Sequence, residues 1–353
     1  MFQQLFAISP EIFIICSIPS LLVMTSVQQA IAPLVPDPLG GVRCKLFPPG
    51  SLQELLRDGY NFDGSSCGFC SVEDSDLVAK PDPSTELDVD GYKLFICDIY
   101  KAGERSDLDS RFALERAVER LSEADLGILV GAEVEFYVLR RRSELSVLDP
   151  WRYMEVVPEA HALSLATRLL RLANPHVKVH FIHHEVGPGQ YELTLMRDGP
   201  RGLADRIILL KWAVRYWVSR EGLVATFMPK PFIDRPGNGM HIHFSLQRGG
   251  RSIMGPGGRR EDGRAIFSGE AASFIAGVLE HARALSILTS PTVNSYKRLM
   301  PGFEAPIYIC WGIGNRSALI RVPEHAAARG RLRVELRSPD PSCNPYLALA
   351  GII

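Results

Sequence analysis

The sequence predicts an α+β fold with a small first unit and a larger second one. Residues 31–100 consist of short strand-like runs and turns, whereas long helical patterns begin at about residue 107. A mostly antiparallel sheet backed by helices fits the order of strands and helices in the second unit better than a regular βαβ alternation. We therefore expect an extension over residues 1–30, a first domain over residues 31–105 and a second domain over residues 106–353.

The first unit contains turn and helix signals with defined ends. Asp37–Gly41 reads as a turn and Val42–Phe47 as a strand. Ser51–Gly59 is a short helix, with its first residue as N-cap, Glu54 at the capping-box position and its last residue as the stop. Tyr92–Ile99 is another strand.

The second unit alternates helices with strands of period two. The expected helices are Asp109–Glu123, His161–Ala173, Leu203–Glu221 and Phe267–Ser290. The expected strands are Leu126–Leu139, Lys178–Glu185, Gln190–Leu195, Ala225–Pro229 and His241–Leu246. Arg248–Arg264 is rich in Gly and Arg and reads as a surface loop. Asn344 followed by a proline and an apolar run opens a last helix, so we expect a C-terminally incomplete domain.

The composition of the 353 residues is that of a globular protein, with 46% hydrophobic and 22% charged residues. The 39 basic residues balance 40 acidic ones, so charge gives no reason to expect nucleic acid or an anionic membrane as a partner. Seven cysteines are an odd set without the density of a disulfide scaffold, which favours a reducing compartment and a cytoplasmic location. The lone Cys67-x-x-Cys70 motif is interpreted as structural or incidental.

The N-terminal segment is almost wholly apolar from Ile12 to Met24 but is interrupted by Pro19. It is shorter than the ~20 residues that a membrane helix needs. The first basic residue is Arg43, so the basic leader of a signal peptide is missing. We interpret residues 1–30 as an extension whose role the sequence does not define.

Acidic and imidazole side chains recur in pairs that should lie close together. They are Glu133 with Glu135, Glu185 with Glu192, His241 with His243, and Glu335 between two arginines. Residues two apart share a strand face, and a Gly-Pro-Gly turn separates the second pair. Carboxylates suit Mg²⁺ or Mn²⁺, and added imidazole favours tolerance of Mn²⁺. The alternative is that each glutamate is a solvated strand residue, and spacing alone leaves both interpretations open.

A second group is basic and follows the acidic one along the chain. Its members are Arg298, Arg316, Arg321, Arg333 and Arg337. Arginine is the preferred bidentate partner of phosphate and carboxylate, so the group is suited to a nucleotide and an acid substrate. The alternative is ordinary surface salt bridging, which contributes little per pair. Neither a P-loop motif nor a G-x-G-x-x-G motif is present, which disfavours those two nucleotide-binding folds.

Five segments resemble the glutamine synthetase family, in order, over roughly residues 37–353. They are residues 61–66 (NFDGSS) with 75–76 and 80–85 (KPDPST); 131–136 (GAEVEF); 183–192 (HHEVGPGQYE); 225–231 (ATFMPKP) with 239–246 (GMHIHFSL); and 294–306 (NSYKRLMPGFEAP) continuing through 315–321 (NRSALIR) and 333–337 (RVELR) to 344–346 (NPY). The resemblance implies a β-grasp-like N-terminal domain and a larger catalytic domain. It also implies a homo-oligomeric ring with active sites shared between subunits.

The resemblance assigns roles to individual residues. Two divalent ions, Mg²⁺ or Mn²⁺, would be held by Glu135, Glu185 and Glu192 and by Glu133, His241 and Glu335. Residues at the ATP positions are Lys230, His243, Ser245 and Arg333. Glutamate would meet Gly237 and Arg298, and the transferring phosphoryl group would meet Arg316, Arg321 and Arg337. From a neighbouring subunit, Asp63 and Ser66 would reach the site, where Asp63 binds ammonium and helps to deprotonate it, and Glu304 would close over the intermediate.

The implied reaction joins ammonia to the γ-carboxylate of glutamate through γ-glutamyl phosphate, giving glutamine, ADP and phosphate. A carboxylate is a poor acyl donor, and its phosphorylation supplies a leaving group. Metals and arginines offset the charge on the transferring phosphoryl group. Ammonium is not nucleophilic, so a nearby carboxylate must accept its proton. We expect Glu335→Ala to abolish metal-dependent activity.

Two departures from the family pattern lie near the expected amine pocket. Arg235-Pro236 precedes Gly237 where the family usually has Asn, and Cys310-Trp311-Gly312 replaces a small residue, an aromatic and Ser. Related ligases for polyamines or other amines often carry Trp-Gly there, so a γ-glutamyl-amine ligase is an alternative, although retention of Asp63 favours ammonia. A non-catalytic structural relative or a truncated inactive product is a further alternative, which the retained ligand candidates disfavour.

Overall fold

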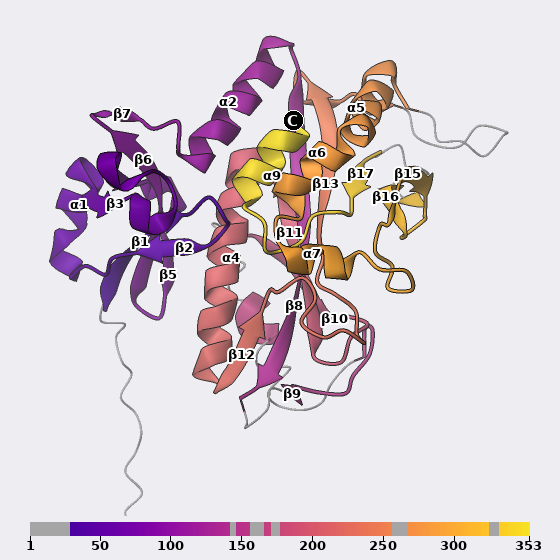
Figure 1. The fold of residues 1–353 in the computed structure, drawn as a ribbon, viewed down its shortest axis with the longest axis horizontal. Coiled ribbons are helices and arrows are strands. Elements are labelled where there is room, and N and C mark those ends of the chain that lie inside the picture. The colour runs from indigo at the N-terminus through magenta and orange to yellow at the C-terminus, as the bar shows by residue number, and fades with distance from the viewer. Residues whose placement is uncertain (1–28, 142–145, 156–165, 171–176, 256–266, 325–331) are drawn as a thin grey trace, which may run out of the picture.

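The computed structural model describes residues 29–141, 146–155, 166–170, 177–255, 267–324 and 332–353 (Figure 1). Over these residues the chain forms two sheets with helices between them and around them. The expected extension falls almost wholly on residues 1–28, which lie outside the described ranges.

The smaller sheet has seven strands and is built from the first third of the chain. Its strands are β1 (Ala30–Pro36), β2 (Val42–Cys44), β3 (Tyr60–Asp63), β4 (Asp76–Pro81), β5 (Leu87–Val89), β6 (Tyr92–Lys101) and β7 (Glu104–Arg105). The order is β2-β1-β6-β4-β3, with β5 and β7 also paired to β6. Only β1 and β6 run parallel among these pairs. Helix α1 (Leu52–Asp58) packs Leu55 against Ile31 and Phe95 of the sheet.

The larger sheet has ten strands and positions the candidate site. Its strands are β8 (Gly127–Arg140), β9 (Ser146–Val147), β10 (Val179–His184), β11 (Gln190–Asp198), β12 (Leu223–Thr226), β13 (Met240–Arg248), β14 (Arg251–Ser252), β15 (Tyr308–Ile313), β16 (Ala318–Val322) and β17 (Val334–Leu336). The order is β10-β11-β8-β13-β17-β16-β15. Every pair is antiparallel except β15 with β16, which confirms the mostly antiparallel sheet.

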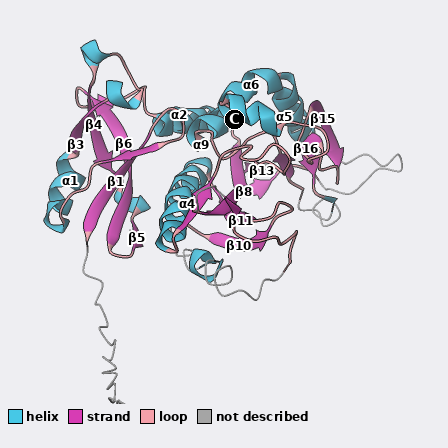
Figure 2. Ribbon diagram, turned by 60° about the horizontal axis from the view of Figure 1, so that its bottom comes forward, coloured by secondary structure: helices cyan, strands magenta, loops and turns pink. Residues whose placement is uncertain are grey.

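Three helices lie between the two sheets in both views of the fold (Figures 1 and 2). They are α2 (Ser110–Glu123), α4 (Pro200–Arg220) and α9 (Pro345–Ile352). Further helices are α5 (Gly269–Glu280), α6 (Ala282–Thr289) and α7 (Val293–Arg298). One apolar core runs from Leu94 of the small sheet through Leu210 of α4 to Phe244 of the large sheet. The two sheets therefore share a core, and burial of that apolar surface holds them together.

A buried arginine also ties the small sheet to the helices. Arg111 of α2 has a fully buried side chain and makes ion pairs with Asp82 (2.9 Å), with Asp98 and with Asp205 of α4 (2.9 Å). Asp82 and Asp98 belong to the first part of the chain and Asp205 to the second. This network therefore spans the junction between the two sheets.

Several predictions about elements need correction. The helix expected over Phe267–Ser290 is two helices, α5 and α6, bent by 73° at His281, which lies between them with φ −91° and ψ 6°. The bend brings α6 against α9, where Leu285 and Leu288 pack so closely on Gly351 that a Cβ there would lie 2.6 Å from the Leu288 side chain. Tertiary packing against α9 thus decides a break that the helical spacing alone does not show.

The start of α1 also differs from the prediction. Ser51 ends a 3-10 turn and makes no side-chain capping bond, so the expected capping box is absent, although Gly59 stops the helix with φ 75° as expected. The strand expected to reach Phe47 ends at Cys44, because the chain then crosses to form an isolated bridge between Phe47 and Ile31.

Two predicted segments are only partly described. The loop expected over Arg248–Arg264 begins as a hairpin in which β14 pairs with β13, and residues 256–264 lie outside the described ranges. Of the helix expected over His161–Ala173, residues 166–170 are described and helical. In the described part of the chain, no single helix has the length and apolar character to cross a membrane; the bent pair α5 and α6 meets that test by length and composition only.

Candidate active site

A cavity of about 440 Å³ opens over the centre of the large sheet. It is bounded by side chains from β8, from the β10–β11 turn, from the segment before β13, from α7 and from residues 302–305. The residues predicted for the site that line it are Glu133, Glu135, Glu185, Glu192, Gly237, His241, Arg298, Glu304, Arg316 and Arg337. The carboxylates and arginines singled out in the sequence therefore meet in one place.

Strand register explains why the acidic residues converge. Strands β11, β8 and β13 are neighbours, and their register sets Glu192 opposite Glu135 and His241 opposite Glu133. Residues directly opposite on adjacent strands have Cβ atoms about 5 Å apart on the same face. On the far side of β13, Glu335 of β17 stands opposite His243.

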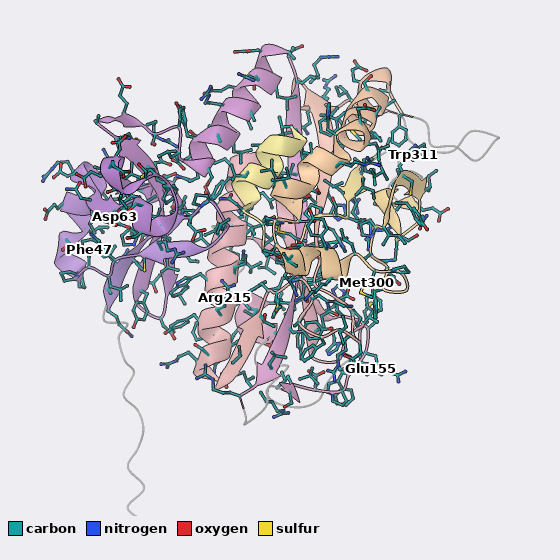
Figure 3. All side chains as sticks on the ribbon, in the orientation of Figure 1. Phe47, Asp63, Glu155, Arg215, Met300 and Trp311 are labelled. Carbon is teal, nitrogen blue, oxygen red and sulfur yellow. The ribbon has the colours of Figure 1, made fainter. Side chains whose placement is uncertain are left out.

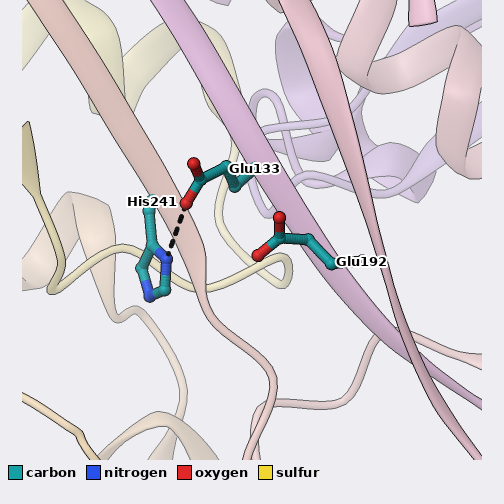
Figure 4. A group of neighbouring side chains, drawn as sticks. All are labelled: Glu133, Glu192 and His241. Carbon is teal, nitrogen blue, oxygen red and sulfur yellow. Dashed lines mark hydrogen bonds and ion pairs between the residues drawn. The ribbon is translucent and has the colours of Figure 1, made fainter. Parts of the chain in front are cut away.

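Two overlapping groups have ligand atoms close enough to share an ion. In the first, atoms of Glu133, Glu192 and His241 all lie within 4.8 Å of one another (Figure 4). In the second, atoms of His183, Glu185 and Glu192 meet the same limit. Glu192 thus belongs to both groups, and His183 joins a group for which the sequence did not propose it.

The remaining two predicted ligands lie just outside these groups. Glu135 Oε1 is 3.9 Å from His241 Nε2, and Glu335 Oε1 is 3.7 Å from His241 Nδ1. Glu335 is fully buried and its carboxylate is held by Arg321 (2.6 Å) and Arg337. The division of the six ligands between two ions stays a prediction.

The titration of these groups follows from their burial together. Burial, and then the charge of Glu185, raises the pKa of Glu135 to about 8. Burial and the neighbouring glutamates likewise raise the pKa of Glu192 well above its usual range. Burial opposes ionisation of Glu133, but hydrogen bonds from His241 and His243 lower its pKa. Burial and the charge of Arg337 lower the pKa of His241 to about 4, so its imidazole is neutral near pH 7.

These residues fit a divalent metal ion. Burial and the neighbouring carboxylates raise the pKa values of Glu135 and Glu192, and a bound cation would offset this repulsion. The neutral imidazole of His241 also has a lone pair free for a metal. In addition, the buried Nδ1 atoms of His183 and His243 have no hydrogen-bond partner within the described residues. Oxygen ligands with added imidazole suit Mg²⁺ or Mn²⁺.

Three arginines give the cavity a basic wall. Arg298 is 4% exposed, and its two terminal nitrogens donate to the carbonyls of Ser338 (2.8 Å) and Arg337 (2.7 Å). Arg337 and the exposed Arg316 also line the cavity. A guanidinium anchored on backbone carbonyls is held in one orientation toward an anionic ligand.

The other predicted site residues do not line this cavity. Lys230 is buried, bonds to the Arg235 carbonyl and lies with its Nζ 3.7 Å from the centre of the Phe303 ring. Arg321 and Glu335 pair with each other. His243 bonds to Glu133, and Ser245 bonds to Ser252. Arg333 is half-buried.

Asp63 ends strand β3 of the small sheet and is exposed (Figure 3), and the exposed Ser66 lies in the 3-10 turn that follows the strand. Hydroxyl groups of Ser65 and Ser66 donate to the Asp63 carboxylate and lower its pKa. Asp63 is thus an ionised carboxylate at the surface, away from the residues that line the cavity.

Sequence reasoning missed Tyr153 and Gln190, which line the cavity, and His183, which lies beside Glu185 and Glu192. Tyr153 lines it and packs edge-on against His183, with ring centres 5.4 Å apart. Gln190 also lines it, and it is a buried amide bonded to Glu135. His183 and Gln190 stand two residues from Glu185 and Glu192 in the quoted segment 183–192, so the period-two pattern used for the glutamates could have pointed to them. Tyr153 lies in a segment without helical or strand periodicity, and no pattern pointed to it.

Fold and cavity together define an α+β protein with a cluster of carboxylates and imidazoles that could hold a divalent ion beside arginines. A model of the glutamine synthetase catalytic domain matches residues 107–353, and one of the glutamine synthetase β-grasp domain matches residues 35–102. The chain belongs to the glutamine synthetase family.

Individual relatives agree with this assignment. The glutamine synthetase of Thermococcus kodakarensis is 44% identical over 321 residues, which cover 89% of this chain and 70% of the relative. That of Pyrococcus abyssi is 43% identical over 313 residues, covering 87% of this chain and 69% of the relative. The chain thus spans about 70% of the length of these relatives.

Solved structures show the same fold. A "GmaS/ADP complex" superposes with a TM-score of 0.81 at 28% identity, covering 93% of this chain and 77% of that one. The cryo-EM structure of Plasmodium falciparum glutamine synthetase gives a TM-score of 0.81 at 26% identity, covering 93% and 71%. The predicted family, its α+β fold with a β-grasp domain and the class of enzyme, a glutamate–ammonia ligase, are confirmed.

Proposed function

We propose that this protein joins ammonia to the γ-carboxylate of glutamate through γ-glutamyl phosphate, releasing glutamine, ADP and phosphate. The observation that carries the proposal is the meeting of Glu133, Glu135, Glu185, Glu192 and His241 with Arg298, Arg316 and Arg337 in one cavity. Such a cavity has both halves that phosphoryl transfer to a carboxylate requires, namely sites for metal ions and fixed cationic groups.

We assign the acidic side to the metals and the basic side to the substrates. Glu135, Glu185 and Glu192 would hold one ion, and Glu133, His241 and Glu335 the other. The ions, when bound, would offset the charge that develops on the transferring phosphoryl group. Lys230, His243, Ser245 and Arg333 would contact ATP from positions around the cavity.

The arginines divide between the amino acid and the phosphoryl group. Arg298 is fixed by two backbone carbonyls and lies beside Gly237, so it would bind the glutamate carboxylate. Arg316, Arg321 and Arg337 would hold the phosphoryl oxygens as the bond to ADP breaks and the bond to the γ-carboxylate forms.

A neighbouring subunit would complete the site in a homo-oligomeric ring. Asp63 at the end of β3 and Ser66 in the turn after it are exposed, so a second copy can meet them. The ionised Asp63 carboxylate would attract ammonium and take its proton. Glu304 lies in an exposed loop with φ 54°, a conformation uncommon for a non-glycine residue, and would close over the acyl phosphate to exclude water.

An organic amine is the second candidate for the acceptor. Tyr153, Val186 and Phe303 line the cavity beside Glu185, so this part of the cavity has an apolar wall next to a carboxylate. Such a wall would accommodate an alkyl group on the amine.

Measuring phosphate release from ATP and glutamate with different amines distinguishes ammonia from an organic amine as the acceptor. We expect ammonium to support faster turnover than methylamine or putrescine at equal concentration of the free base. Faster turnover with putrescine than with ammonium would show that the acceptor is an organic amine and not ammonia. ATP binding without turnover for every acceptor would instead support a non-catalytic relative or an inactive product.

A matched pair of variants ties turnover to the cavity. Glu192→Gln is expected to lower turnover at least about 100-fold, because it removes a charge from both groups of ligands. Glu280→Gln, on the exposed face of α5, serves as the control with unchanged turnover.

We place the reaction in the cytoplasm, which the free thiols of the six cysteines in the described ranges support. We retain residues 31–105 and 106–353 as the two domains, a division supported by the ranges of the two family matches.

A further inference from the structure

Gln190 is a buried amide at the first position of β11, and it is 1% exposed. Its Nε2 donates toward three acceptors: Glu135 Oε2 (3.2 Å), the Gly237 carbonyl (3.0 Å) and Asn238 Oδ1 (3.1 Å). Its oxygen accepts from the Gly187 amide (3.1 Å). The orientation of the amide is therefore fixed, because a flip would turn its oxygen toward three acceptors.

The amide nitrogen carries two hydrogens, fewer than the three acceptors around it. The three acceptors therefore compete for these hydrogens. Glu135 Oε2 also accepts a hydrogen bond from the Gly239 amide (2.7 Å). The carboxylate therefore contacts the segment 237–239 directly through Gly239 and indirectly through Gln190. How strongly Glu135 Oε2 competes for the amide hydrogens therefore decides how firmly Gln190 holds that segment.

The segment held by Gln190 has no room to shift alone. A Cβ on Gly237 would lie 2.5 Å from the Pro229 carbonyl and 2.7 Å from the side chain of Arg298. A Cβ on Gly239 would lie 2.7 Å from His241 Nε2. Movement of this backbone thus changes the position of Arg298 on one side and of His241 on the other.

We propose that Gln190 couples the metal position to the amino-acid position of the active site. A divalent ion bound at Glu135 would take up lone pairs of its carboxylate and make Oε2 a weaker acceptor for Gln190. The amide hydrogens of Gln190 then turn to Gly237 and Asn238, which fixes the backbone beside Arg298 in the conformation that binds glutamate. This inference rests on the proposed function, and Gln190 is a positioning residue in it.

A purely structural role for Gln190 predicts a different result. An amide that only stabilises the β10–β11 turn would, when removed, lower stability and weaken both ligands by independent amounts. A coupling residue, when removed, changes how strongly one ligand depends on the other. The ratio of Mn²⁺ dissociation constants without and with saturating glutamate measures that dependence directly.

The experiment is calorimetric titration of the full chain with Mn²⁺, in the absence and presence of saturating glutamate. For the unmodified protein we expect glutamate to tighten Mn²⁺ binding at least about fivefold. Gln190→Met removes both donors and is expected to bring this ratio close to one, while weakening Mn²⁺ binding about 10–100-fold. Gln247→Met, on β13 and away from the cavity, is the matched control and should keep the ratio of the unmodified protein.

Gln190→Glu is the second variant, because it keeps the size of the side chain if the methionine variant does not fold. It replaces the donors with a charge facing Glu135, so the ratio should again approach one. A ratio unchanged in either folded variant overturns the inference, as does binding of both ligands to the unmodified protein without coupling. Absence of Mn²⁺ and glutamate binding in the unmodified protein overturns the proposed function itself.

Discussion

Glu135 shows how burial turns a carboxylate into a group that titrates near neutral pH. Its pKa is raised to about 8, mainly by burial and secondly by the charge of Glu185. Between about pH 4.5 and 8 the folded state therefore holds a proton that the unfolded state has lost. The free energy of unfolding falls as pH rises through this window.

The metal-free protein should accordingly lose stability between pH 5 and pH 8, by an amount on the order of a few kcal/mol. Glu135→Gln should flatten this dependence, because an amide does not titrate, and Mn²⁺ should restore stability at pH 8. Urea unfolding with a chelator present measures it, with the exposed Glu280→Gln as the control. Equal slopes for the unmodified protein and Glu135→Gln would contradict the raised pKa.

Glu335 illustrates why the structure changes the choice of variant. The side chain is fully buried between Arg321 and Arg337, so Glu335→Ala leaves two arginines without their partner, at a cost of about 3–5 kcal/mol. Glu335→Gln keeps the volume and removes the charge.

We expect Glu335→Gln to remain folded and to lose metal-dependent phosphate release at least about 100-fold. Release at saturating Mg²⁺ and Mn²⁺, together with thermal unfolding, separates loss of function from loss of fold. Turnover near that of the unmodified protein in ordinary Mg²⁺ would remove Glu335 from the site.

At the scale of elements, the N-cap residues of helices α1 and α9 can be compared directly. Asn344 caps α9 by accepting from the amides of Tyr346 (3.0 Å) and Leu347 (3.2 Å), and its own amide donates to the Asp37 carbonyl (2.9 Å). Ser51 at the start of α1 makes no such bond. The N-cap side chain therefore stabilises the start of α9 but not the start of α1.

Asn344→Ala should lower the free energy of unfolding by about 1–2 kcal/mol, because it leaves two backbone amides at a buried helix end without their acceptor. Ser51→Ala should change it by less than about 0.5 kcal/mol. Urea unfolding of both variants tests this difference. An equally large loss for Ser51→Ala would show that its cap forms in solution.

For the whole molecule, Arg111 adds a charged link to the apolar core that joins the two sheets. Its side chain is fully buried among Asp82, Asp98 and Asp205, which come from both parts of the chain. Removing Arg111 would take away the cation that these three carboxylates share. Asp82 would keep its pair with Arg201 and Asp98 its pair with Arg105, but the pair with Asp205 would be lost and repulsion between the carboxylates would act across the junction.

Arg111→Met should therefore cost about 3–5 kcal/mol. Arg116→Met is the control from the same helix, since Arg116 pairs with Asp107 at the surface (2.9 Å) with both side chains exposed, and it should cost less than about 1 kcal/mol. Urea unfolding followed by tryptophan fluorescence measures both. A loss for Arg111→Met no greater than that for Arg116→Met would show that the core alone joins the sheets.

Local patterns in the sequence are sufficient to predict most elements and the family. Strand β8, helix α4 and the cap at Asn344 follow from side-chain period and capping chemistry, which depend on residues a few positions apart. The pairing of Glu133 with Glu135 on one strand face is predictable for the same reason.

Other features depend on which elements pack together. The break at His281, the place of Glu192 in two ligand groups and the three acceptors of Gln190 each involve residues brought together by strand order or by contact with α9. Strand order and register are set by burial of the whole core, and no local pattern contains them. The sequence therefore determined the elements and the chemical groups of the site, and the tertiary structure decided which of those groups face one another.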